Sequence, residues 1–288
     1  MATKTAIKTD MVGQTFGPFV REYDWKALSM FALGSGAAFD GKTDLQYVYE
    51  AKNMKMLPTF AAMPIVDAEV TKTIDWGYDY TGSLHWSFDV KFHQPMKKLE
   101  GTLSTKVLLK GLYDRGEGRG TLAQHIGDTY DDEGNLLFTC ESWDCCIFDG
   151  GWDGPTAPKD IVEIPEREPD YEVTEKIAEN RALIYRLSGD THPQHVDWEY
   201  AQKVGYPKPN CHAVSTAGVA CRHIINSVLG GDSERLTRFK TRITKPLFPG
   251  CTVKTQIWKW DDNSVRFRVI DADNPDMIYF NFALAEYK

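Results

Sequence analysis

The sequence of 288 residues lacks a long apolar run, so no segment of it is expected to span a membrane as a helix. Residues 1–14 carry charge but no apolar core, so a secretory signal is not expected. Basic residues are fewer than acidic ones, 33 against 41. A general nucleic-acid binder needs a surplus of cations to neutralise phosphates. We therefore expect an intracellular globular protein that binds neither nucleic acid nor membrane.

The sequence also lacks the common metal and nucleotide motifs. No two cysteines form a Cys-x-x-Cys pair, and the seven histidines show no His-Glu-x-x-His spacing. A Walker A sequence and a Gly-x-Gly-x-x-Gly turn are both missing. We expect no metal and no separate cofactor. The six cysteines, which include the adjacent Cys145 and Cys146, are expected to be reduced, buried thiols.

A break in composition divides the chain near its middle. Residues 149–170 hold four prolines, several glycines and many charges without any periodicity, which is typical of an extended linker. We place domains at 1–150 and 171–288, joined by a Pro/Gly-rich linker at 151–170. Each part has an aromatic-x-Leu step before a glycine turn, at Phe31 and Tyr185, and later a strand that runs into a proline. The similar spacing indicates a tandem duplication; two unrelated β-rich lobes are the alternative.

Strand patterns dominate both parts. Apolar and polar residues alternate over 84–92, 265–269 and 278–284, which predicts sheets with one buried face. One long helix is predicted at 212–229, ended by Gly230-Gly231. The small residues in its first half suit a helix packed closely against surrounding backbone. The counterpart in the first part, 58–83, is interrupted by Pro64 and glycines, so no comparable helix is expected there.

Residues 185–213 hold the best candidate for chemistry. Asp190 follows a Ser-Gly turn, expected at the end of an extended approach, and His195 follows after Pro193. A histidine with a pKa of about 6.5 exchanges a proton at physiological pH, and a carboxylate beside it can orient water. Such a pair accelerates a reaction by about 10²–10⁴. Free N–H groups at the start of the predicted helix suit a developing oxyanion. From these residues alone, ordinary turn and surface roles stay open.

The motif resembles that of the MaoC-like, or hydratase 2, family of (R)-specific enoyl-CoA hydratases. The residues that carry the resemblance are Tyr-Arg-Leu-Ser-Gly-Asp-Thr-His-Pro-Gln-His-Val-Asp at 185–197 and His-Ala-Val at 212–214. Stretches at 31–37, 44–50, 57–60 and 245–250 look like the two-repeat, eukaryotic peroxisomal-type members. The resemblance implies an α+β double hot-dog fold, with two tandem hot-dog repeats, antiparallel sheets side by side and a long central helix in the second repeat. It also implies a non-catalytic first repeat that accommodates the acyl chain.

The resemblance assigns a catalytic pair. Asp190 and His195 would activate a water that adds to C3 of a trans-2-enoyl-CoA, with a proton delivered to C2. The product would be a (3R)-hydroxyacyl-CoA, and the reverse dehydration uses the same groups. The backbone N–H of Ala213, where the family has glycine, would hold the thioester oxygen. His192 stands where the family has asparagine, and it could donate one hydrogen bond while changing charge and shape.

Further positions match ligand contacts of the family: His85, Trp86, Arg115 and Ile243. Trp86 replaces a family glycine and is expected to fill part of the acyl tunnel, which would favour short or different acyl groups. Arg115 would bind CoA phosphate. Gly36 or Ala37 occupies the position matching Asp190 in the first repeat, so one active site per chain is expected.

The remaining expectations concern charges, partners and location. Four other basic residues, Arg222, Arg238, Lys240 and Arg242, are further candidates for binding the CoA phosphates, but we expect them rather to be solvated surface charges. The implied ligand is an acyl-CoA, CoA being part of the substrate, and the family implies a homodimer. The last four residues differ from a peroxisomal Ser-Lys-Leu address, so they do not support the peroxisomal location that is common in the family. We expect an intracellular location, in the cytoplasm or the peroxisome. A non-catalytic acyl-CoA-binding hot-dog protein and a hot-dog acyl-CoA thioesterase are the alternatives.

Overall fold

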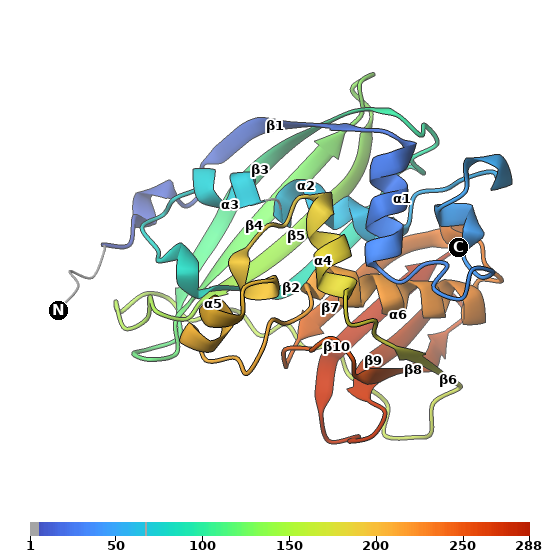
Figure 1. The fold of residues 1–288 in the computed structure, drawn as a ribbon. Coiled ribbons are helices and arrows are strands. Elements are labelled where there is room, and N and C mark those ends of the chain that lie inside the picture. The colour runs from blue at the N-terminus through green and yellow to red at the C-terminus, as the bar shows by residue number, and fades with distance from the viewer. Residues whose placement is uncertain (1–5, 67) are drawn as a thin grey trace.

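Ten antiparallel strands form one continuous sheet in the computed structural model, which describes residues 6–66 and 68–288 (Figure 1). The first five residues of the charged N-terminal segment lie outside this range. In sheet order, the first-half strands are β1 (Thr15–Tyr23), β3 (Gly101–Asp114), β4 (Thr121–Tyr130), β5 (Leu136–Cys146) and β2 (Ser83–Phe92). The second-half strands follow as β7 (Leu236–Ile243), β10 (Ile278–Tyr287), β9 (Ser264–Asp271), β8 (Thr252–Asp261) and β6 (Tyr171–Lys176).

The two halves of the sheet repeat one topology. The order β1-β3-β4-β5-β2 in the first half has its counterpart in β6-β8-β9-β10-β7 of the second. The halves meet where β2 pairs with β7, for example at Phe88 opposite Thr241 and Val90 opposite Phe239. The predicted side-by-side sheets are thus joined edge to edge. Residues 147–170, all of them described, contain no helix or strand and connect β5 to β6.

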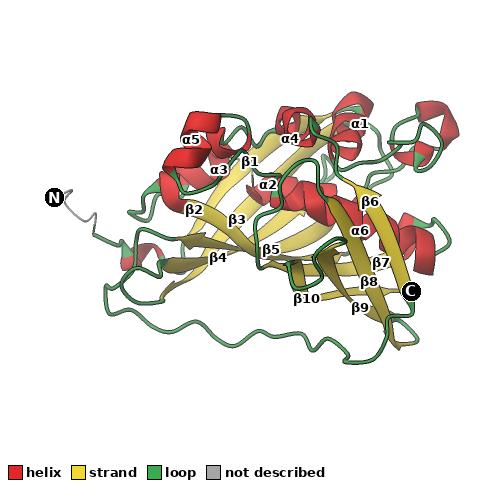
Figure 2. Cartoon of the chain, turned by 60° about the horizontal axis from the view of Figure 1, so that its bottom comes forward, coloured by secondary structure: helices red, strands yellow, loops and turns green. Residues whose placement is uncertain are grey.

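The α-helices gather on one side of the sheet (Figure 2). They are α1 (Trp25–Gly34), α2 (Met63–Val66), α3 (Ala68–Thr73), α4 (Arg181–Tyr185), α5 (Trp198–Lys203) and α6 (Ala213–Val228). Short 3₁₀ turns lie at Thr9–Met11, Leu45–Tyr47, Glu50–Lys52, Pro58–Ala62, Tyr80–Gly82, Arg186–Ser188, Pro193–His195 and Ser233–Arg235. No helix of the described residues is both long enough and apolar enough to cross a membrane.

The long helix α6 confirms the prediction for 212–229, and its small residues allow close contact with the first half. A Cβ at Gly218 would lie 2.5 Å from the Cβ of Ser35, so a larger residue would push the two segments apart. Ser215 donates its hydroxyl to the carbonyl oxygen of Gly34 at 2.6 Å. After α6, Gly230 and Gly231 adopt φ of 65° and 85°, a conformation that glycine takes without strain. The start of α6 is thereby held against the first half.

The first half has only a broken counterpart of α6, as predicted. A 3₁₀ turn at Pro58–Ala62 is followed by α2 and α3, and every residue from Pro58 to Val66 is buried. One local prediction was wrong: the chain does not approach Asp190 as an extended strand. Residues 181–188 form α4 and a 3₁₀ turn instead. This helix packs against α1, where a Cβ at Gly34 would lie 2.7 Å from the Cα of Tyr185.

The prediction that Arg222 is a solvated surface charge was also wrong. Its side chain is 3% exposed, on α6, and its guanidinium binds Asp44 at 2.6 Å and Glu175 at 2.5 Å. Because Asp44 belongs to the first half and Glu175 to β6, this buried cation links the two halves. The same prediction was wrong for Lys240, which is buried and pairs with Asp160. Arg238 is partly buried and pairs with Asp89 and Glu286.

Candidate active site

A cavity of about 250 Å³ lies between the two halves of the chain, and all eight predicted site residues line it. The second half contributes Asp190, His192, His195, Ala213 and Ile243. The first half contributes His85 and Trp86 from β2 and Arg115 from the turn after β3. The fold therefore brings residues that are far apart in the sequence to the wall of one cavity.

Asp190 lies in the loop after the 3₁₀ turn Arg186–Ser188, where Gly189 has φ 128°. One carboxylate oxygen, Oδ1, accepts a hydrogen bond from the backbone N–H of His192 at 3.2 Å. Burial alone would raise the pKa of this carboxyl. The neighbouring His212, His195 and His85, together with the bond from His192, outweigh burial and lower the pKa below its usual 3.8. Asp190 is therefore ionised at neutral pH.

His195 ends the 3₁₀ turn Pro193–His195 and is buried. Its Nδ1–H donates to the carbonyl oxygen of Asn210 at 2.8 Å, which leaves the lone pair on Nε2. The amide of Gln194 lies 3.2 Å from that Nε2 and donates to it. Burial lowers the pKa of His195, although Asp190 opposes the shift. His195 is thus a neutral base, with a ring nitrogen within 4.8 Å of an Asp190 carboxylate oxygen.

His212, the residue before α6, supports this pair in a way the motif did not reveal. Its ring stacks on that of His195 with centroids 3.7 Å apart, and its Nε2–H donates to the carbonyl oxygen of Asp190 at 3.1 Å. Burial and then His195 lower its pKa well below 6.5. In the sequence, His212 stands out only as part of the motif, and no pattern indicates a role for Asn210 or Gln194. A buried histidine next to the motif was the available signal.

His192 carries no charge at neutral pH. Burial, reinforced by His195, lowers its pKa to about 4. Its Nδ1 accepts from the backbone N–H of Gln194 at 3.4 Å, so Nε2 carries the proton. The expectation that histidine here brings a change of charge was therefore wrong, while the difference in shape from asparagine stands.

The N-terminus of α6 opens on the cavity at Ala213 and Val214. The first hydrogen bond of this helix runs from the N–H of Thr216 to the carbonyl of His212. The N–H groups of the three residues before Thr216 consequently have no acceptor within the helix. With the positive end of the helix dipole, they form a site suited to an oxygen that gains negative charge.

Asp190, His195 and His212 bring three potential metal-ligand atoms within 4.8 Å of one another. The two imidazole planes, however, stack with an angle of 26°. Lone pairs in nearly parallel planes point side by side and do not converge on one ion, as tetrahedral coordination requires. The arrangement is better suited to proton transfer than to coordination.

A second cavity, of about 460 Å³, adjoins the first through Trp86 and Arg115, which line both. The guanidinium groups of Arg115 and Arg242 lie 4.7 Å and 4.5 Å from the centre of the Trp86 ring. Burial and the nearby Arg115 lower the pKa of Arg242. Arg119 and Lys159 also line this space, with Asp114 and Asp160. The second cavity is therefore a basic pocket. It shares Trp86 and Arg115 with the first cavity.

The position matching Asp190 in the first repeat is filled by other groups. A Cβ on Gly36 would lie 2.6 Å from atoms of both Arg181 and Glu175, whose side chains form a buried ion pair at 3.1 Å. There is no room for a carboxylate at this position. Neither Gly36 nor Ala37, the two positions that can match Asp190, supplies a carboxylate, so the first repeat holds no counterpart of Asp190.

Comparisons with known proteins decide the family. The MaoC like domain matches residues 160–276, and the MFE-2 hydratase 2 N-terminal domain matches residues 21–144. The 3-hydroxyacyl-thioester dehydratase Y of Mycobacterium tuberculosis is 31% identical over 274 residues, which cover 91% of each chain. The chain belongs to the MaoC-like hydratase 2 family.

Other proteins are similar over most of the chain. Mouse peroxisomal multifunctional enzyme type 2 is 27% identical over 279 residues; these cover 94% of this chain but only 37% of the mouse protein. The solved MaoC-like dehydratase of Phytophthora capsici has a TM-score of 0.83 at 26% identity, with 98% of each chain covered. A Mycobacterium tuberculosis protein described as a double hotdog fold has a TM-score of 0.63 at 14% identity, with 96% and 95% covered. The predicted double hot-dog fold is confirmed.

Proposed function

We propose that this chain catalyses the (R)-specific hydration of trans-2-enoyl-CoA to (3R)-hydroxyacyl-CoA, or the reverse dehydration. It is a hydro-lyase of the MaoC-like family. One observation carries the proposed chemistry: an ionised Asp190 and a neutral His195 lie together in one cavity with the open N-terminus of α6. Two acceptors beside a group of N–H donors suit the addition of water to a polarised double bond.

In the hydration direction, a water molecule takes the place of the Gln194 amide at Nε2 of His195 and donates its two hydrogens to that nitrogen and to the Asp190 carboxylate. Its oxygen forms a bond to C3, and the electrons of the double bond move toward the thioester oxygen. The N–H of Ala213 and the helix dipole stabilise that oxygen. The proton removed from water is then delivered to C2. One water is added, with its hydroxyl on C3 and its proton on C2.

His192 and Ala213 differ from the family residues without removing these elements. Ala213 contributes its backbone N–H, so its methyl group affects only the space in the cavity. His192 is neutral and donates its backbone N–H to Asp190. These two differences from the family therefore affect which substrates fit the cavity, and they leave the acid–base pair in place.

The second cavity suits the anionic part of CoA. Arg115 and Arg242 offer planar guanidinium groups for phosphate oxygens, and Trp86 stacks with both of them. The first cavity, of about 250 Å³, is smaller than a common ligand pocket of roughly 300–1,000 Å³. Trp86 lines it beside Ile243 and Val66. We infer that short acyl groups are preferred.

The test is an ultraviolet assay of trans-2-enoyl-CoA esters with short, medium and long acyl chains. Loss of the absorbance of the conjugated thioester without release of free thiol supports hydration. Release of thiol from CoA supports the thioesterase alternative. Tight binding in calorimetry without turnover of any ester supports the non-catalytic binder and overturns the proposal.

Assembly and location are further parts of this proposal. We propose a homodimer, as the family implies; light scattering that gives only the monomer mass of 32.6 kDa would contradict it. We also propose an intracellular location, cytoplasmic or peroxisomal. Each of the six cysteines is a free thiol, and five of them are buried, which fits a reducing compartment.

A further inference from the structure

A second Asp–His pair lines the same cavity from the first-half wall. The Nδ1 of His85, on β2, lies 2.9 Å from a carboxylate oxygen of Asp144, on the adjacent β5. Both residues line the cavity that holds Asp190 and His195. Asp144 is only 5% exposed, so water does not screen the pair effectively. The sequence motif does not include Asp144, and the mechanism above does not use it.

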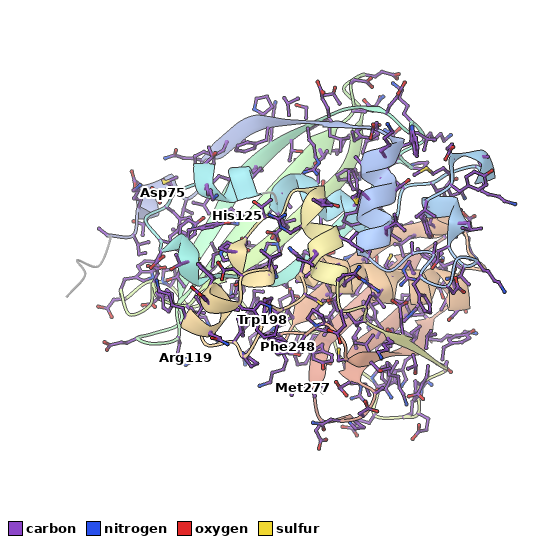
Figure 3. The ribbon with its side chains drawn as sticks, viewed as in Figure 1. Asp75, Arg119, His125, Trp198, Phe248 and Met277 are labelled. Atoms are coloured by element: carbon purple, nitrogen blue, oxygen red, sulfur yellow. The ribbon has the colours of Figure 1, made fainter. Side chains whose placement is uncertain are left out.

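The charges around this pair favour a protonated His85. Burial would lower the pKa of His85, but the carboxylate of Asp144 and then that of Asp190 raise it above 6.5. Burial would raise the pKa of Asp144, but His85 and His125 hold it far below its usual value. His125, labelled in Figure 3, lies on β4 with its Nδ1 3.5 Å from the second oxygen of Asp144. Asp144 is thus held ionised from two strands.

Other titratable groups near the pair come from several elements. From the second half, His195 and His212 respond electrostatically to His85, each with a lowered pKa. From the first half, Tyr78 and Cys146 lie close enough to Asp144 for its charge to raise their pKa values, after burial. These neighbours are neutral at pH 7. The two carboxylates, Asp144 and Asp190, thus both favour the protonated form of His85.

The second ring nitrogen of His85 indicates that this residue does more than form a structural ion pair with Asp144. Its Nε2 is buried and has no hydrogen-bond partner among the residues that the structure describes. A buried donor without an acceptor is costly and rare in a folded protein. Since His85 lines the cavity, a substrate oxygen can supply the missing acceptor. Neutral His85 would keep its only proton on Nδ1, toward Asp144, so Nε2 donates only in the cation.

We propose that Asp144 is a positioning residue of this active site, which holds His85 as a cation beside Asp190. The cation keeps the Asp190 carboxylate ionised and donates from Nε2 to an oxygen of the bound acyl thioester. Negative charge that develops on the substrate during hydration is then stabilised from the first-half wall, opposite the N-terminus of α6. The inference rests on the proposed hydratase function.

The test combines two variants with one matched control. In Asp144→Asn the ring stays in place while the charge that favours the imidazolium is lost. In His85→Gln the cation is removed altogether. Asp128→Asn makes the same substitution on β4 of the same half-sheet, where Asp128 binds Thr139 at 2.6 Å and does not line the cavity. Histidine side-chain NMR of wild type and Asp144→Asn, assigned with His85→Gln, measures the pKa of His85 without any activity.

We expect the pKa of His85 to fall from above 6.5 to below 6.5 in Asp144→Asn. The alkaline limb of its kcat profile should move down with it, so that kcat at pH 7.5 falls by roughly ten- to hundredfold and recovers at pH 5.5. His85→Gln should move the acid limb upward, because His195 and Asp190 both lose a neighbour that lowers their pKa values, and Asp128→Asn should match wild type.

The outcomes separate the two proposals. A wild-type chain without hydratase activity defeats the proposed function, whereas the NMR shift still tests the charge on His85. An active wild type together with an unchanged pH profile in Asp144→Asn overturns the inference. A loss of activity that is equal at every pH also overturns it, because a structural defect would not be rescued by acid.

Discussion

The carboxylate of Asp190 can be replaced by an amide of almost the same shape, which separates its charge from its place in the fold. Asn at this position keeps an oxygen that can accept from the N–H of His192, and its backbone carbonyl still accepts from His212. We therefore expect Asp190→Asn to fold and to bind acyl-CoA. The amide nitrogen is a donor, however, and it can bind the Nε2 lone pair of His195, which blocks the base.

The size of the effect follows from these two losses. The water loses one acceptor outright, and the second is occupied by the new donor. Loss of positioned acid–base catalysis costs about 10²–10⁴ in rate. At about 1.36 kcal/mol for each factor of ten, that range corresponds to roughly 2.7–5.4 kcal/mol of barrier height. The binding elements are untouched, since the N–H of Ala213 and the guanidinium of Arg115 do not contact this carboxylate, so KM should change little.

The measurement is kcat and KM with the preferred trans-2-enoyl-CoA, together with calorimetric titration of a saturated acyl-CoA. Asp197→Asn is the matched control, seven residues further on. Asp197 is exposed and caps α5 by accepting from the N–H of Tyr200, a role that asparagine also fills. A folded, ligand-binding Asp190→Asn variant whose kcat stays within threefold of wild type would refute the assignment of Asp190.

Three further predictions follow from the same geometry. Trp86→Gly should enlarge the first cavity and raise kcat/KM for medium and long acyl chains relative to short ones, as measured across a series of esters. Because burial lowers the pKa of His195, the acid limb of kcat/KM should have its midpoint below pH 6.5, and a limb at or above 6.5 would contradict a neutral buried base. Arg222→Met leaves the buried Asp44 without its cation and Glu175 with Arg181 as its remaining cation, so the free energy of unfolding should fall by about 3–5 kcal/mol in urea titrations.

Features that lie within one continuous segment were predictable from the amino-acid sequence alone. The Asp190–His195 spacing lies within one short segment, and the helix at 213–228 shows its pattern over several turns. The alternation in β9 reports the two faces of a sheet directly, whereas bulges interrupt it in β2 and β10. Even Trp86 and Arg115, matched by resemblance, line the expected cavity. These features need only local order or a recognisable motif.

Errors arose where local pattern and tertiary packing disagree. The approach to Asp190 carries a turn sequence that is compatible with a strand, and contact with α1 makes it helical. Arg222 looks like any charged residue on a helix, yet it is buried because Asp44 and Glu175 meet it there. A single side chain in a sequence does not show which partners will compensate its burial.

The protonation states are the clearest product of tertiary structure. Asp190 is ionised because histidines from several segments surround it, and His195 is neutral because it is buried and donates to Asn210. Asp144 joins the same cavity from a strand in the other half of the chain. Sequence spacing identifies which acids and bases are present. Burial and distance between segments, which only the fold sets, decide which of them carry the protons.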